Sequence, residues 1–224
     1  MLAAVPRRTF LRYSGAGIAL TGLLLAGCDD NETVPDPDIP VTSVSVGTGD
    51  FGVLNYAYAL EQLEYAFYAA VVGGAYFASA SAAEKAIFQD LRDHELAHRD
   101  FFKTVLSTNA IKELTPDFSA INFGDRNSVI TNAKAFEDLG VHAYNGAGPL
   151  LLSDQYLTLA GKIVSVEARH AALIRELVQA DTFVANDVVD LSTGLERSKT
   201  PAEVVAIANT FLQAGSKLDV SGLV

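Results

Sequence analysis

Residues 91–98 read LRDHELAH and residues 163–170 read IVSVEARH. Each stretch contains one Glu-x-x-His pair inside a run of apolar residues at helical spacing; the pairs are Glu95 with His98 and Glu167 with His170. Residues three apart on a helix are neighbours on one face, so both side chains of a pair can reach toward one point. The two stretches therefore predict two helices that turn an acid and an imidazole toward a common core.

Two further glutamates, Glu61 and Glu137, also lie within apolar stripes, and each is followed seven residues later by a tyrosine, Tyr68 or Tyr144. Seven residues are about two helical turns, so each tyrosine shares the face of its glutamate. The tyrosines either support carboxylates on neighbouring helices by hydrogen bonds or are ordinary core aromatics. Glu64 can also face this core, but the repeated seven-residue interval favours Glu61 as the ligand.

Several buried carboxylates in one core are costly unless cations neutralise them. The candidate ligand set contains four carboxylates and two imidazoles: Glu61, Glu95, His98, Glu137, Glu167 and His170. These donors suit two iron or manganese ions, and zinc needs fewer carboxylates. A single Glu-x-x-His pair is more often a solvated contact on a helix surface, whereas two pairs on apolar faces favour metal ligation. We expect His94 and His142 to lie at the surface or to support ligands.

The apolar periodicity predicts an all-α fold. Four long helices are expected at about residues 51–72, 81–107, 128–145 and 153–180, and a short fifth helix at about 200–214. Ser81 with Glu84, and Thr200 with Glu203, predict capping boxes at two of the helix starts. The irregular stretch 109–127 is long for a hairpin and predicts a crossover between helices two and three. Residues 51–180 would form the bundle, and residues 181–224 a C-terminal extension packed on it.

The first 27 residues predict a signal peptide. Arg7 and Arg8 resemble a twin-arginine export signal, and the uncharged run that follows is shorter than the roughly 20 residues of a membrane-spanning helix. That run ends in a sequence resembling a lipobox, which predicts lipidation at Cys28. Residues 28–50 are acidic and rich in proline, as in a flexible tether. We expect an exported lipoprotein that faces the periplasm or cell exterior and contacts the membrane only through its lipid anchor.

The composition limits the number of domains, the partners and the covalent cross-links that the chain can have. With 224 residues, 50% of them hydrophobic, the chain can bury one sizeable core. The formal net charge is −11, and the predicted leader holds three of the 16 basic residues and none of the acids, so nucleic acid is a poor partner. The single cysteine excludes a disulfide within the chain.

The helical segments also resemble a known superfamily. The residues that carry the resemblance are Leu54-Asn55-Tyr56-Ala57, Leu60-Glu61-Gln62-Leu63-Glu64, Phe67-Tyr68, Phe136-Glu137 and Ala143-Tyr144, together with the two Glu-x-x-His pairs. They are similar to the ferritin-like superfamily, in which two helices each give a glutamate and two each give Glu-x-x-His. Within this superfamily, the sequence resembles an exported bacterial ferritin-like domain family related to desiccation-associated proteins.

The resemblance implies a ferritin-like four-helix bundle with a dinuclear iron or manganese centre held by the six candidate ligands. For such a centre the leading hypothesis is an oxidoreductase acting on dioxygen or hydrogen peroxide, as a ferroxidase, a peroxidase or a catalase-like enzyme, and a homo-oligomer is possible. The main alternative is a non-catalytic, stress-associated bundle with a structural or vestigial metal site. A radical-generating oxidase of an organic substrate is a third reading.

Overall fold

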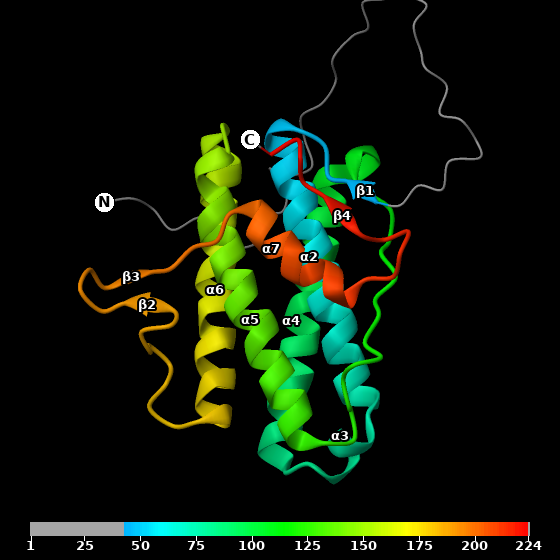
Figure 1. Ribbon diagram of the computed structural model, residues 1–224, viewed down its shortest axis with the longest axis vertical. Helices are drawn as coiled ribbons and strands as arrows, with labels where there is room; N and C mark the ends of the chain where they lie inside the picture. The colour runs from blue at the N-terminus through cyan, green and yellow to red at the C-terminus, as the bar shows by residue number, and fades with distance from the viewer. Residues whose placement is uncertain (1–42, 224) are drawn as a thin grey trace, which may run out of the picture. The chain divides into compact units, whose positions relative to one another are not determined.

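The computed structural model describes residues 43–223, so the predicted signal peptide, Cys28 and most of the predicted tether lie outside the described residues. Four long helices dominate the described part: α2 (Gly49–Gly73), α4 (Ala82–Leu106), α5 (Arg126–Ala147) and α6 (Asp154–Val178) (Figure 1). The predicted all-α bundle is confirmed, with helix ends within about two residues of those expected. Between residues 43 and 223, no helix is long and apolar enough to cross a bilayer.

The long helices form two neighbouring pairs, α2 with α4 and α5 with α6. The first pair is joined through a short helix, α3 (Ala75–Ser79), which the sequence pattern did not predict, and the second through a single turn, η2 (Gly148–Leu150). After α4 and the turn η1 (Ser107–Asn109), an irregular segment runs along the bundle to the start of α5 (Figure 1). This segment is the predicted crossover, and it makes α4 and α5 run in the same direction.

Local capping explains where several helices begin. The hydroxyl of Ser81 accepts a hydrogen bond from the Glu84 amide, but the Glu84 carboxylate contacts the Ser81 hydroxyl instead of its amide, so this predicted capping box is only half formed. The box at Thr200 and Glu203 is complete and opens α7 (Pro201–Ala208). A turn, η3 (Asn209–Phe211), follows α7. The fifth helix therefore ends before the predicted residue 214.

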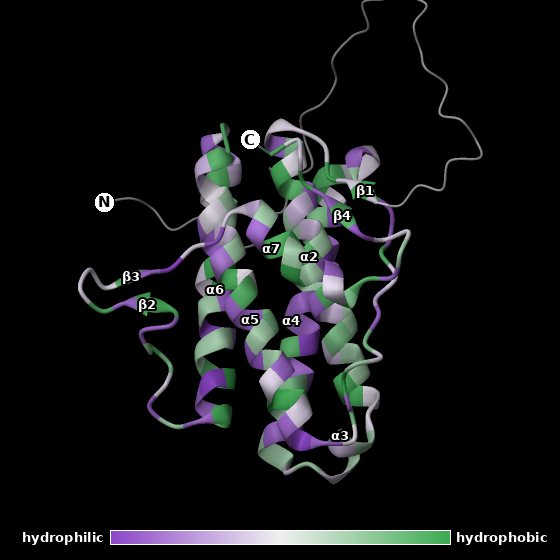
Figure 2. Ribbon diagram, in the orientation of Figure 1, coloured by the Kyte–Doolittle hydropathy of each residue, from purple (hydrophilic) through white to green (hydrophobic). Residues whose placement is uncertain are grey.

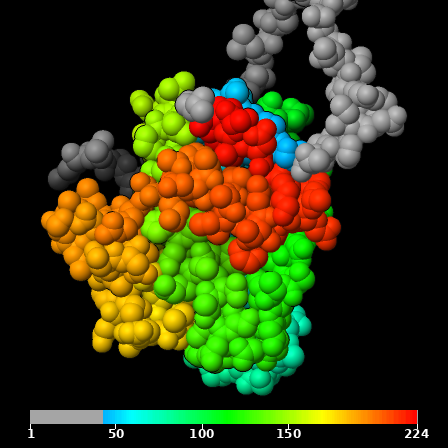
Figure 3. All heavy atoms as spheres, viewed as in Figure 1, coloured from blue at the N-terminus to red at the C-terminus, as the bar shows by residue number. Residues whose placement is uncertain are grey.

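Helix α2 is buried along most of its length, although Figure 2 shows polar residues interspersed among its hydrophobic ones. Helices α4 and α5 pack against it, and the C-terminal segment, orange to red, lies over the upper part of the face shown in Figure 3. From that segment, Val204, Ala208, Leu212 and Leu218 join the main hydrophobic core. The C-terminal extension is thus part of the same core as the bundle.

The predicted tether ends earlier than residue 50. Strand β1 (Val44–Ser45) pairs in parallel with β4 (Leu218–Asp219), and Val44 and Val46 are buried. Because the pairing partner lies at the far end of the chain, no local pattern in residues 43–50 could have predicted this contact. A second small pair, β2 (Val189–Asp190) with β3 (Leu195–Glu196), forms a hairpin beside α5 and α6 (Figure 1).

Candidate metal centre

All six candidate ligands meet in the middle of the bundle, and each long helix contributes at least one. They form two groups, Glu61, Glu95, His98 and Glu167 in one, and Glu95, Glu137, Glu167 and His170 in the other. Within each group, one ligand atom of every residue lies within 4.8 Å of the others. All four carboxylates are completely buried. Because Glu95 and Glu167 belong to both groups, the arrangement has the form of two adjoining sites with two shared carboxylates.

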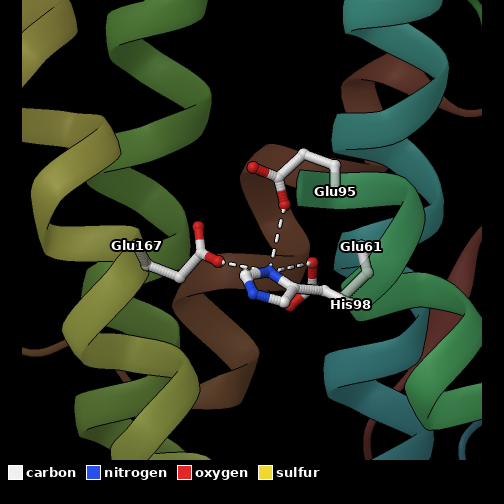
Figure 4. Close-up of side chains that lie close together, drawn as sticks. All are labelled: Glu61, Glu95, His98 and Glu167. Carbon is white, nitrogen blue, oxygen red and sulfur yellow. Dashed lines mark ion pairs between the residues drawn. The ribbon is translucent and has the colours of Figure 1, made fainter. Parts of the chain in front are cut away.

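The Nδ1 atom of each histidine lies among three carboxylate oxygens. His98 Nδ1 is 2.7 Å from Glu167 Oε1, 3.4 Å from Glu95 Oε2 and 3.5 Å from Glu61 Oε2 (Figure 4). His170 Nδ1 is 2.8 Å from Glu95 Oε1, and its other two contacts are 3.4 Å to Glu167 Oε2 and 3.7 Å to Glu137 Oε2. Neighbouring ligands of one octahedral ion, bound at about 2.1 Å, lie about 3 Å apart. The observed spacing therefore suits shared ions.

The donor atoms facing these two points lack other partners. Within residues 43–223, eight of them are buried and have no hydrogen-bonding partner outside the six residues: Glu61 Oε2, both oxygens of Glu95, His98 Nδ1, Glu137 Oε2, both oxygens of Glu167, and His170 Nδ1. Buried polar atoms are nearly always satisfied, and an unsatisfied carboxylate is especially costly. One cation at each point would satisfy all eight, so the residues fit a dinuclear metal site.

The two tyrosines cross-link the helices that carry the single glutamates. The Tyr68 hydroxyl on α2 donates to Glu137 Oε1 on α5 at 2.5 Å, and the Tyr144 hydroxyl on α5 donates to Glu61 Oε1 on α2. Each tyrosine engages one carboxylate oxygen and leaves Oε2 facing the centre. Such hydrogen bonds fix the orientation of a ligand, which favours the supporting role for both tyrosines.

The remaining acids and imidazoles lie outside the two groups. Glu64 is buried, but its carboxylate lies against α5, where a Cβ on Gly140 would come within 2.8 Å of Glu64 Oε1. His142 is buried rather than exposed, and it faces the β2–β3 hairpin, with Nε2 4.0 Å from Glu196 Oε1. His94 is exposed, and its Nδ1 lies 2.9 Å from His170 Nε2. Sequence spacing could not reveal this contact because it depends on how α4 packs against α6.

In the metal-free chain, protons balance the charges of the centre. Burial opposes a charged imidazole, but hydrogen bonds with Glu167 and neighbouring carboxylates outweigh it, raising the pKa of His98 to about 12 and of His170 to about 11. Burial, reinforced by the charge of Glu167, raises the pKa of Glu61 to about 8. For Glu95, burial raises the pKa, but hydrogen bonds with the two imidazoles prevail and lower it to about 2. Protons thus concentrate where cations would otherwise bind.

A protein-family model for the ferritin-like domain matches residues 49–180, more than half of the chain. The chain belongs to the ferritin-like domain family. The match spans α2 to α6, the helices that carry all six candidate ligands, and confirms the resemblance at the level of the superfamily. A comparison with curated proteins finds no match.

Proposed function

We propose that this ferritin-like protein is an exported, lipid-anchored oxidoreductase whose dinuclear iron or manganese centre reacts with dioxygen or hydrogen peroxide. The observation that carries the proposal is the set of eight buried ligand atoms that have no partner outside the six residues, at the meeting point of four helices. A bound pair of iron or manganese ions would supply electrons for reducing the oxidant. The narrower relationship to exported, desiccation-associated ferritin-like proteins is part of this proposal.

The protein residues hold the centre in place and keep water away from it. Glu95 and Glu167 each direct one oxygen to the half-site of His98 and the other oxygen to the half-site of His170. A change of charge in one half would therefore alter the electrostatic interactions in the other. Tyr68 and Tyr144 hold the outer oxygens of the other two glutamates. Because the four carboxylates are fully buried, electrostatic interactions within the centre are weakly screened.

A small cavity at one end of the bundle favours a small apolar molecule as the oxidant. A cavity of about 20 Å³ is lined by apolar side chains such as Leu54 and Phe102 and by the tyrosines Tyr56 and Tyr144. It shares Tyr144, Gly148, Leu151 and Ala160 with a wider depression of about 400 Å³. Roughly 10–15 Å³ is enough for one water-sized molecule. Tyr144, which bonds to Glu61, lies in the lining of this cavity. Since the apolar lining offers peroxide few hydrogen bonds, the cavity would admit dioxygen more readily than hydrogen peroxide, and it is too small for a bulky organic substrate.

Metal analysis tests the centre. We expect about two ions per chain in protein expressed with iron or manganese, and strongly reduced metal content in the double variant Glu167→Ala, His170→Ala. The matched control is Asp90→Ala, Asp93→Ala, which removes two exposed acids from α4. A folded double variant that binds as much metal as the wild type would refute the dinuclear site.

Turnover tests the reaction. We expect metal-loaded protein to consume dioxygen with ferrous iron, or hydrogen peroxide with a reductant, faster than the same concentration of free metal. Consumption of dioxygen but not peroxide would agree with the apolar lining of the cavity. Metal-loaded protein that consumes neither oxidant above the free-metal control would reject the enzyme and favour the non-catalytic, stress-associated bundle with a structural metal site.

Membrane attachment is tested in cells. The variant Cys28→Ser removes the proposed lipidation site and is expected to move the protein from the membrane fraction to the soluble fraction. Replacing Arg7 and Arg8 with lysine is expected to reduce export. Unchanged fractionation of Cys28→Ser would contradict the lipid anchor without affecting the metal centre.

A further inference from the structure

An exposed histidine outside the six-ligand set forms a hydrogen bond with one of the ligands. His94 Nδ1 lies 2.9 Å from His170 Nε2. The two rings are inclined by only 24° and their centroids are 5.1 Å apart. Nearly coplanar rings at this separation fit a hydrogen bond between His94 Nδ1 and His170 Nε2 that lies in the plane of both rings.

The direction of this bond follows from the other nitrogen of His170. His170 Nδ1 faces Glu95, Glu137 and Glu167, so it is the atom available to a cation. The proton of a ligating imidazole must then be on Nε2. His170 Nε2–H therefore donates, and His94 Nδ1 accepts.

The two halves of the centre differ in this respect. His98 occupies the equivalent position in the other half, but within residues 43–223 its Nε2 forms no hydrogen bond. The side chain of His98 is also more exposed than that of His170, at 14% compared with 6%. Only the half built from Glu137 and His170 thus has its imidazole oriented by an outer partner.

We propose that His94 is a positioning residue that fixes the ring orientation and tautomer of His170, so that the half-site of Glu137 and His170 binds its ion more tightly than it otherwise would. The inference rests on the proposed dinuclear centre. Outer partners of ligating histidines typically contribute 10–100-fold in metal affinity. Because His94 is exposed, its replacement changes this hydrogen bond without opening a cavity in the core.

Co²⁺ binding tests the inference. It is measured by visible absorption and calorimetry on the full-length wild type and on three variants. His94→Leu removes the acceptor, His94→Gln retains an acceptor oxygen, and Asp90→Leu is the matched control one turn earlier on the exposed side of α4. We expect the wild type and Asp90→Leu to bind two ions. In His94→Leu, one of the two dissociation constants should rise about 10–100-fold, with His94→Gln closer to the wild type.

Nitrogen-15 NMR of Zn²⁺-loaded protein measures directly which imidazole nitrogens of His94 and His170 carry a proton. We expect the wild type to show a protonated Nε2 on His170 and an unprotonated Nδ1 on His94. Two unchanged Co²⁺ affinities in a folded His94→Leu variant, or a protonated Nδ1 on His94, would overturn the inference while leaving the dinuclear centre intact. A wild-type chain that binds no Co²⁺ would instead refute the proposed centre and this inference together.

Discussion

Removing the metal should make the stability of the protein fall as the pH rises. The pKa of Glu61 is 4.5 in the unfolded chain and about 8 in the folded, metal-free protein. Across that interval the folded protein keeps a proton that the unfolded chain has lost, so the free energy of unfolding falls by about 1.4 kcal/mol per pH unit. Over the whole interval, this single group accounts for at most about 5 kcal/mol.

The other groups of the centre determine the width of the window. Burial, followed by the charge of Glu95, raises the pKa of Glu137. Glu137 therefore lowers the free energy of unfolding as the pH rises, as Glu61 does. The raised pKa values of His98 and His170 extend the loss of stability from pH 6.5 to about 11 or higher. The lowered pKa of Glu95 has the opposite sign, but it acts only below pH 4.5. The net expectation is a continuous decrease from about pH 5 upward.

Urea unfolding followed by circular dichroism measures this effect in chelator-treated and Mn²⁺-loaded protein at about pH 5, 7 and 9. We expect the metal-free protein to lose several kcal/mol across this range, approaching the total stability of a typical domain. The loaded protein should show a much flatter profile because cations replace the protons. Glu61→Gln, which removes one titrating group, should reduce the slope. A metal-free stability that is constant or rises between pH 5 and 8 would refute the reasoning.

Three substitutions test the surroundings of the centre by urea unfolding. Tyr144→Phe removes the donor to the buried Glu61 carboxylate and is expected to cost about 1–3 kcal/mol in metal-loaded protein. Gly146→Ala places a methyl group on the carbonyl oxygen of Lys199, so we expect a loss of about 1–3 kcal/mol and faster amide exchange in α7. Arg175→Met removes a buried guanidinium and leaves the half-buried Asp138 carboxylate with Lys134, 3.6 Å away, as its remaining ion-pair partner, so we expect a loss of about 1–3 kcal/mol.

Each substitution has a matched control elsewhere in the chain. Tyr156→Phe removes a hydroxyl that forms no hydrogen bond within residues 43–223. Gly161→Ala meets no atom within 4 Å and should stabilise α6 by about 0.5–1 kcal/mol. Arg169→Met changes an exposed arginine on the same helix as Arg175. A control that destabilises the protein as much as its test variant would contradict the corresponding contact.

The helices and the cluster of candidate ligands were predictable because both depend on local spacing. Apolar residues at three- and four-residue intervals define a buried face, and a Glu-x-x-His pair on that face requires a partner in the core. The choice between Glu61 and Glu64 was less secure, since both are buried in α2. The structure separates them through α5, where Gly140 gives Glu64 room away from the centre.

Contacts between distant parts of the chain were not predictable. Residues 44–45 read as a continuation of the tether, yet they pair with residues 218–219. His142 was expected either at the surface or in support of a ligand, but the hairpin beside α5 covers it. In each case the deciding partner is remote in sequence, and no local pattern records its position.

The sequence by itself determined four helices, a crossover and six residues that could hold metal ions, because periodicity and ligand chemistry are properties of the chain. The tertiary structure decided how these residues combine. It groups Glu61 with His98 and Glu137 with His170, shares Glu95 and Glu167 between the groups, and crosses the tyrosines between α2 and α5. Those partnerships depend on the rotation and direction of each helix against its neighbours, which are set by packing across the whole core.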